Sequence, residues 1–360
     1  MVTSADAARF DDTFEGVDRI VAFGDIHGDY DQFLRLLKQA ELIDESLTWT
    51  GGDAHFVQIG DILDRGPDSR KIADLIMNLE GQAKRAGGRV HFVIGNHEAM
   101  NLVGDLRYVH AGEYEAFAGP GAERNQDASY RAHVRRIKNT RPKREWPDFD
   151  DAYEAKWKAE HPLGWAELRT AWGPKGDYGD WLLDQPAVLK INDMLFVHGG
   201  LGPTFLEADL AWLNDAVYSD LRRGIYNANG VAFDQEGPLW YRGLAWGEEE
   251  TEGPHVDALL AKHGVNHIVI AHTPVTGAIL PRFGDKVLAI DVGLGQHYGR
   301  RDAYLEVTDG QLRSIHRGRR LVIPSEGGEA LLDYLKEAAA LDPQPSPIEK
   351  KIRALELETN

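Results

Sequence analysis

Five short apolar segments of this chain are each followed closely by side chains that can bind a metal ion. The segments cover residues 19–24, 54–60, 89–95, 194–197 and 266–270, and short apolar runs of this kind are typical of buried strands. The side chains that follow them are Asp25 and His27, Asp61, Asn96 and His97, His198, and His272. Because ligand sites in open α/β sheets form beyond the carboxyl ends of the strands, we expect these side chains to meet at one edge.

The first hundred residues alternate strands with helices. Apolar residues at helical spacing predict helices at residues 33–40 and 72–79, and the second helix is expected to end at the two glycines of residues 87–88. This β-α-β-α-β order implies parallel neighbouring strands with helices on the faces of the sheet. We therefore expect an α/β fold with central β-sheets flanked by helices.

The type and spacing of the candidate ligands favour two metal ions. Asp25 and His27 are two residues apart, so in an extended chain both point to the same side and can bind one ion. The two carboxylate oxygens of Asp61 can bridge two ions. The second ion would be completed by Asn96, His198 and His272. Oxygen and imidazole ligands without a thiolate suit Mn, Fe or Zn.

The composition narrows the possible partners. The 360 residues include 40 Lys and Arg against 58 Asp and Glu, a formal net charge of −18, which argues against nucleic acid or an anionic membrane as the main partner. The absence of cysteine excludes disulfides and thiol nucleophiles. No segment approaches the roughly 20 apolar residues of a membrane span, and residues 1–12 lack a signal-peptide pattern. We expect a cytoplasmic protein, or a periplasmic one if a leader has been removed.

Residues 102–185 differ from the rest of the chain. They hold five of the nine tryptophans and a basic cluster at residues 131–144, which is a solvated surface or a guide for an anionic substrate. We interpret this stretch as a mostly helical, cap-like insertion within one domain that covers residues 1–360. Strands resume after it, with a hairpin that turns at residues 308–310. Residues 342–360 form a C-terminal tail.

Several sequence blocks resemble the signature motifs of the phosphoprotein phosphatase family, within the calcineurin-like metallophosphoesterase superfamily. They read Gly-Asp-Ile-His-Gly at residues 24–28, Gly-Asp-Ile-Leu-Asp-Arg-Gly at 60–66, Gly-Asn-His-Glu at 95–98, His-Gly-Gly at 198–200 and Ala-His-Thr-Pro at 271–274. With Leu-Trp-Tyr-Arg-Gly-Leu at residues 239–244, the chain is most similar to the bacterial Shewanella-like protein phosphatases. The family's usual C-terminal signature is absent, and the insertion is longer than in the eukaryotic serine/threonine enzymes.

The resemblance implies a calcineurin-like fold and a role for each matched residue. Two divalent ions, manganese or else iron or zinc, would be bound by Asp25, His27, Asp61, Asn96, His198 and His272. Asn96 would also contact the substrate phosphate, which Arg65 and Arg242 would hold. His97 would protonate the leaving oxygen and Asp64 would orient His97. A hydroxide that bridges the ions would attack phosphorus in line.

Three further residues stand near these motifs. Glu98 follows His97, and we expect it to be structural or to support the ligands. His297 and Tyr298 follow the apolar segment at residues 287–290 and are candidates for the wall of the site.

The sequence therefore predicts a phosphatase that hydrolyses phosphate monoesters of phosphotyrosine, phosphoserine or phosphothreonine in proteins. The alternative is a diadenosine tetraphosphatase or another nucleotide phosphoesterase, which would share every catalytic residue. A binding protein that keeps the fold without activity is a third reading, opposed by the intact His97, Asp64 and Arg65. The expected partner is a phosphorylated protein or a small phosphomonoester, and the oligomeric state stays open.

Overall fold

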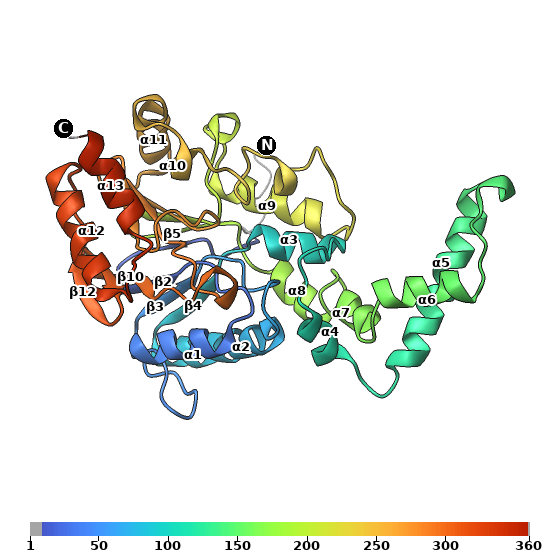
Figure 1. Cartoon of the computed structure of the whole chain (residues 1–360). Helices are drawn as coiled ribbons and strands as arrows, with labels where there is room; N and C mark the ends of the chain where they lie inside the picture. The colour runs from blue at the N-terminus through green and yellow to red at the C-terminus, as the bar shows by residue number, and fades with distance from the viewer. Residues whose placement is uncertain (1–8, 359–360) are drawn as a thin grey trace, which may run out of the picture.

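The computed structural model describes residues 9–358 and contains two six-stranded β-sheets flanked by helices (Figure 1). In spatial order, the first sheet holds β1 (Thr13–Phe14), β5 (Val188–Ile191), β6 (Met194–Val197), β7 (His267–Ile270), β9 (Val287–Ala289) and β8 (Leu280–Arg282). The second holds β12 (Arg319–Val322), β11 (Gln311–His316), β10 (Ala303–Thr308), β2 (Arg19–Phe23), β3 (His55–Gln58) and β4 (Arg89–Phe92). The α/β fold predicted from the sequence is confirmed.

Strands β2, β3 and β4 form the predicted β-α-β-α-β unit. They pair in parallel, and the helices α1 (Tyr30–Gln39) and α2 (Ser69–Ala86) connect them. Helix α1 begins where the Asp29 side chain accepts a hydrogen bond from the Gln32 N–H, and α2 ends at Gly87 in the left-handed conformation. Phe33 of α1 is fully buried, with its ring edge-on to that of Phe23 in β2. These contacts fix the helices on the sheet and place the three strand ends at one edge.

The strands that carry candidate ligands are divided between the two sheets, which differs from the single edge that the sequence suggested. Strands β2, β3 and β4 belong to one sheet, whereas β6 and β7 are parallel neighbours in the other. The carboxyl ends of strands from both sheets therefore meet at the site. Hydrophobic patterning locates the end of a strand, but it does not say which strands pair, because pairing depends on contacts that are distant in sequence.

The C-terminal half completes both sheets and covers them. The predicted hairpin of β10 and β11 is present, and β10 pairs antiparallel with β2. The helices of this half are α9 (Leu210–Leu221), α10 (Gly243–Trp246), α11 (Glu249–His263), α12 (Glu329–Leu341) and α13 (Glu349–Glu358). Leu335 of α12 packs with Ile348 and Ile352 in a small second core, so the tail contains a docked helix. Within residues 9–358, no helix combines the length and the apolar character needed to cross a bilayer.

The stretch between β4 and β5 is helical, as predicted. Its helices are α3 (Asn96–Val103), α4 (Ala111–Phe117), α5 (Ala122–Thr140), α6 (Asp151–Glu160), α7 (Trp165–Ala171) and α8 (Asp177–Leu183). Helices α5 and α6 project away from the two-sheet body, whereas α3, α4, α7 and α8 lie against it (Figure 1). We call residues 119–163 the arm. The basic cluster at residues 131–144 lies on α5 and on the chain that follows it, within this arm.

The tryptophans of this stretch fall into two groups. In the arm, Trp157 is buried beside Tyr130 and stacks on His161, with the ring centroids 4.0 Å apart. Trp172 and Trp181, in contrast, belong to the main core, where the Trp181 ring lies 5.0 Å from that of Phe92 in β4. The arm therefore has an aromatic cluster of its own, and the residues that follow it are part of the body.

We predict that the arm can be removed without unfolding the body. A Cβ atom at Gly164 would lie 1.8 Å from the Tyr114 carbonyl oxygen and 3.0 Å from the Ala118 nitrogen, so the chain leaves and re-enters the body at adjacent points. Replacing residues 120–162 with a short Gly-Ser linker should leave the denaturation midpoint, measured by circular dichroism, nearly unchanged.

The matched control is Trp172→Ala in the full chain, which should destabilise the body by about 3 to 5 kcal/mol because it opens a cavity in the main core. A deletion variant that aggregates, or that loses as much stability as Trp172→Ala, would contradict an independent arm.

Candidate metal centre

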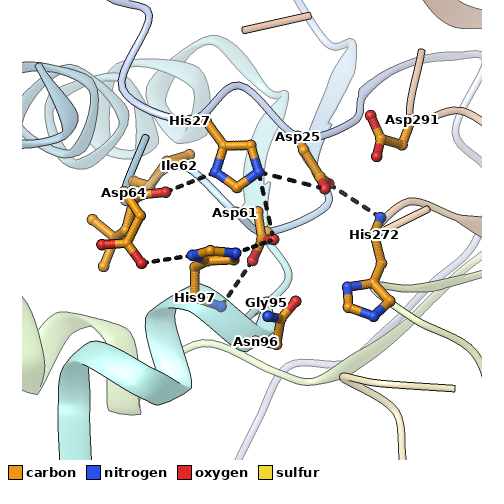
Figure 2. Close-up of polar contacts among 12 residues, drawn as sticks. Asp25, His27, Asp61, Ile62, Asp64, Gly95, Asn96, His97, His272 and Asp291 are labelled. Carbon is orange, nitrogen blue, oxygen red and sulfur yellow. Dashed lines mark hydrogen bonds and ion pairs between the residues drawn. The ribbon is translucent and has the colours of Figure 1, made fainter. Parts of the chain in front are cut away.

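The structure brings the six predicted metal ligands together where β2, β3, β6 and β7 end and α3 begins; all of them except His198 are labelled in Figure 2. All six are buried, with relative exposures of 6% or less: Asp25, His27, Asp61, Asn96, His198 and His272. Charged and imidazole side chains are rarely so deeply buried unless they are paired or bind an ion. Figure 2 shows most of these side chains pointing toward one another around Asp61.

Asp61 is common to two groups of potential metal ligands. One carboxylate oxygen and ring nitrogens of His27 and His97 all lie within 4.8 Å of one another, and Asp61 forms a second such group with His198 and His272. Asp61 Oδ2 is 3.9 Å from His27 Nε2, whereas Oδ1 is 3.3 Å from His198 Nε2. The two oxygens thus face different imidazoles, which is the arrangement that a carboxylate shared by two ions requires.

His27 and His272 present the form of histidine that binds metals. His27 Nδ1 lies 2.8 Å from the Leu63 carbonyl oxygen, which can only accept a hydrogen bond, so Nδ1 carries the proton and Nε2 faces the carboxylates. His272 Nε2 is buried without a hydrogen-bond partner among residues 9–358. Burial lowers the pKa of His27 to about 3 and holds that of His272 well below its ordinary value. Both imidazoles are therefore neutral near pH 7.

His198 and Asp61 form a buried pair of opposite charge, with 3.3 Å between His198 Nε2 and Asp61 Oδ1. His198 Nδ1 lies 2.7 Å from the Ile59 carbonyl oxygen, and Nε2 lies 2.9 Å from Asn96 Oδ1. Burial opposes charge on either group. The attraction between them outweighs it, raising the pKa of His198 and lowering that of Asp61 well below the usual range. A positive charge is therefore stabilised at this position. The same oxygen and nitrogen atoms can bind a divalent cation. The residues fit a metal ion.

The loops that carry these residues have an uncommon backbone conformation. Five residues of the predicted site have positive φ angles: His27 (47°), Asp61 (50°), Asp64 (68°), Arg65 (66°) and His272 (65°). A residue other than glycine pays about 1 to 3 kcal/mol for such a conformation, which persists only where surrounding contacts enforce it. Local strain concentrated at candidate ligands is a mark of a functional site.

Glu98 supplies one of those enforcing contacts. Its Oε1 accepts hydrogen bonds from the N–H groups of Ile62 (3.0 Å) and Leu63 (3.2 Å), and its Oε2 accepts from Asp61 (2.8 Å) and Gly95 (2.9 Å). Burial raises the pKa of Glu98 to about 7, but four donors occupy the lone pairs of both oxygens, so the geometry is that of a carboxylate. The supporting role expected for Glu98 is thus to join the loop after β3 to the start of α3.

His97 and Asp64 form a buried pair beside the ligands. His97 Nδ1 lies 2.6 Å from Asp64 Oδ2, and the Asn101 side chain donates to Asp64 Oδ1 at 3.1 Å. Burial opposes protonation of His97, but the charge of Asp61 and the hydrogen bond with Asp64 raise the pKa of His97 above its ordinary value. His97 Nε2 points into the site, 3.8 Å from Asp61 Oδ2. The pair can hold a proton on His97 Nε2 and donate that proton to a group bound in the site.

The two predicted phosphate-binding arginines are held by different parts of the chain. The Arg65 guanidinium stacks over the Tyr108 ring at 4.0 Å, and its buried Nε has no hydrogen-bond partner among the described residues. Arg242 Nη1 donates to the His272 carbonyl oxygen (3.1 Å) and to Thr273 Oγ1 (2.7 Å). These contacts orient both guanidinium groups and leave further N–H groups for an anion.

Sequence reasoning missed Asp291 and did not single out Asn101. Asp291 lies two residues after the end of β9, is 1% exposed, and lies beside Asp25 in Figure 2. Burial raises the pKa of Asp291 to about 6. The rule that located the other ligands, a polar residue after a buried strand, also applies to it and could have found it. Tyr298, in contrast, lies on the wall of the site as a candidate residue should, with its ring 5.5 Å from that of His27.

Comparisons with known proteins agree with this geometry. The family model for calcineurin-like phosphoesterases matches residues 18–276. Shewanella-like protein phosphatase 2 of Arabidopsis thaliana is 32% identical over 314 residues, which cover 82% of this chain and 76% of that protein. An uncharacterised protein of Schizosaccharomyces pombe is also 32% identical, over 83% of this chain and 81% of its own length. The solved structure of a cold-active protein-tyrosine phosphatase from a psychrophilic Shewanella species has a TM-score of 0.65 at 29% identity, covering 89% of this chain and 85% of that one.

We predict that Glu98→Gln impairs metal binding although Glu98 itself binds no ion. The substitution replaces one acceptor oxygen with an NH₂ group that faces two backbone N–H groups, and each buried N–H left without a partner costs about 1 to 3 kcal/mol. The loop of Asp61 should loosen, and isothermal titration with Mn²⁺ should show an affinity at least tenfold weaker.

Glu113→Gln is the matched control. Glu113 is equally buried, but only its Oε1 accepts a hydrogen bond, from the Ser69 N–H, and its Oε2 has no partner among residues 9–358. Glutamine can keep that single bond. Equal losses of Mn²⁺ affinity in the two variants would mean that Glu98 acts through general stability and not through the ligand loops.

Proposed function

This chain belongs to the calcineurin-like phosphoesterases and is a metal-dependent phosphatase, and from this premise we propose that it hydrolyses phosphate monoesters in phosphorylated proteins. The observation that supports the proposal is the shared position of Asp61 between two sets of ligands, with the His97–Asp64 pair beside them. A protein-tyrosine phosphatase among the similar solved structures supports a phosphoprotein substrate, with phosphotyrosine among its residues.

In this proposal, the chain would hold two divalent ions. Asp25 and His27 would bind one, Asn96, His198 and His272 would bind the other, and Asp61 would contact both. When bound, such ions supply a Lewis acid and lower the pKa of a water molecule to near neutrality, which provides the nucleophile. The neutral imidazoles of His27 and His272 suit this role because they bring no charge that competes with a cation.

The remaining site residues would act on the substrate. Arg65 and Arg242 would orient phosphate oxygens through their free N–H groups, and arginine is suited to this because its planar fork can contact two oxygens. His97 would donate the proton at Nε2 to the leaving oxygen, while Asp64 keeps the ring oriented through Nδ1. Phosphoryl transfer depends mainly on positioning and charge stabilisation, and these groups provide both.

The first test removes the metals. Incubation with a chelator should abolish hydrolysis of p-nitrophenyl phosphate, and Mn²⁺ should restore it. Asp61→Asn should lower the measured content of both ions, because the shared negative charge is lost, whereas Asp215→Asn on the exposed side of α9 should change neither metal content nor rate. Full activity of metal-free protein with the chelator present would exclude the mechanism.

Phosphopeptides assayed beside diadenosine tetraphosphate would separate a protein phosphatase from a nucleotide phosphoesterase.

The second test separates proton donation by His97 from metal support. A serine alkoxide needs a proton to leave, whereas p-nitrophenolate departs without one, and general acid catalysis contributes roughly 10² to 10⁴-fold. His97→Asn should therefore lose about two or more orders of magnitude on phosphoserine peptides in single-turnover assays, and much less on p-nitrophenyl phosphate. Asp64→Asn should show the same pattern more weakly, because it removes only the orienting partner.

Metal content decides the interpretation, because His97 also belongs to one of the two groups of potential ligands. The proposal requires that His97→Asn still binds two ions. Equal losses on both substrates with metal content intact would show that His97 is not the acid, and loss of one ion would assign His97 to the metals.

A further inference from the structure

A second concentration of positive charge lies beside the metal centre. A pocket of about 420 Å³ opens between the segments that follow β7 and β9 and the beginning of α13. Its lining includes Pro274, Val292, Tyr298, Arg301, Lys350 and Lys351, and we call it the basic pocket. Tyr298 also faces His27, with the two ring centroids 5.5 Å apart, so the pocket and the metal centre share a wall.

The charge of the basic pocket is unusual for this chain. Acidic residues outnumber basic ones by 58 to 40, yet no Asp or Glu is among the residues that line the pocket. The neighbouring carboxylates are engaged elsewhere: Asp302 pairs with Arg35 at 2.8 Å, and Glu349 pairs with Arg353 at 3.1 Å. Among the side chains of residues 9–357, no ion pair joins Arg301, Lys350 or Lys351 to a carboxylate. Three cations that share a pocket repel one another, and an anion between them relieves that repulsion.

Close packing holds the wall of the pocket in place. A Cβ atom at Gly293 would lie 2.9 Å from Tyr298 Cβ and 3.6 Å from Arg301 Cγ, so the loop after β9 leaves room there for glycine alone. Pro347 lies against Gly277, where a Cβ atom would be 2.8 Å from Pro347 Cγ and 3.6 Å from Arg301 Cδ. Ile348, just before α13, and Ile352 within α13 are buried in the small second core. Lys350 and Lys351 are therefore presented by a docked helix.

Resting on the proposed phosphoprotein substrate, we propose that the basic pocket binds a second anionic group of the same substrate chain. That group is a carboxylate or a further phosphate close in sequence to the phosphorylated residue that is hydrolysed. Both offer the oxygens that ammonium and guanidinium groups bind. The enzyme would then prefer phosphopeptides with acidic or phosphorylated neighbours over neutral ones.

The test uses the full-length Mn²⁺-loaded enzyme and a set of phosphopeptides with identical phosphorylated residues. One peptide has neutral neighbours, a second series carries Glu at each flanking position in turn, and a third carries phosphoserine there. We expect the best acidic peptide to exceed the neutral one by about tenfold in kcat/KM, the size that two or three partly exposed charge pairs give together. The Glu and phosphoserine series show which of the two anions the pocket selects.

The double variant Lys350→Gln/Lys351→Gln should reduce the acidic-to-neutral ratio toward one. The matched control is Lys84→Gln, which removes an exposed positive charge near the end of α2, at the edge of the sheet opposite the strand ends, and should keep the ratio. Salt provides a second measurement that needs no variant. The wild-type ratio should fall as ionic strength approaches about 1 M, where the Debye length is about 3 Å.

The outcomes distinguish this inference from the proposed function. Two results would overturn the proposed role of the basic pocket and leave the phosphatase proposal standing. One is turnover of neutral phosphopeptides with no preference for acidic ones, and the other is a preference that survives in the double variant. Hydrolysis of p-nitrophenyl phosphate with no turnover of any phosphopeptide would overturn both.

Discussion

Asp61 ties together the loop after β2, the loop after β3 and the start of α3. Its carbonyl oxygen accepts hydrogen bonds from the N–H groups of Ile26 and His27, at 3.2 and 3.0 Å, which fixes the loop after β2. Its own N–H donates to Glu98, and its Oδ1 accepts from the His97 N–H at 3.0 Å, which fixes the start of α3. The left-handed backbone of Asp61 makes these contacts compatible, because it turns the carboxylate toward the ligands while the peptide groups bond in other directions. One residue thus sets both the geometry of the backbone and the charge of the centre.

The same residue explains how an acidic chain can act on an anionic substrate. Asp25, Asp61 and Asp291 are buried together, and burial of carboxylates that lie near one another is costly unless cations offset their charge. Bound metal ions would provide that offset and reverse the sign of the local charge. Arg65 and Arg242 add fixed positive groups at the rim, and the basic pocket extends the positive region outward. The net charge of −18 therefore describes the whole surface and not the part that the substrate would meet.

The sequence located the candidate ligands that the structure brings together, but it did not predict the pairing of the strands around them. Strand ends and short motifs located Asp25, His27, Asp61, His198 and His272, because a ligand that follows a buried strand depends on local pattern alone. The same pattern could not show that β6 and β7 belong to a second sheet, since strand pairing is decided by contacts distant in sequence. Nor could it show that α13 docks on the body. The sequence therefore placed Lys350 and Lys351 only in a C-terminal tail, although they line a pocket beside the site.

The division of the ligands between two sheets has a further consequence for how the chain is organised. Residues before the arm supply Asp25, His27, Asp61 and Asn96, and residues after it supply His198 and His272. Asp61 lies in the first group yet is within 3.3 Å of His198 in the second, so the complete ligand set exists only when the sheets are docked. A ligand that binds only the assembled site stabilises the assembled state by mass action. Metal binding would therefore hold the two sheets together. The arm is inserted in the chain between the two groups of ligands, and its ends return to adjacent points on the body.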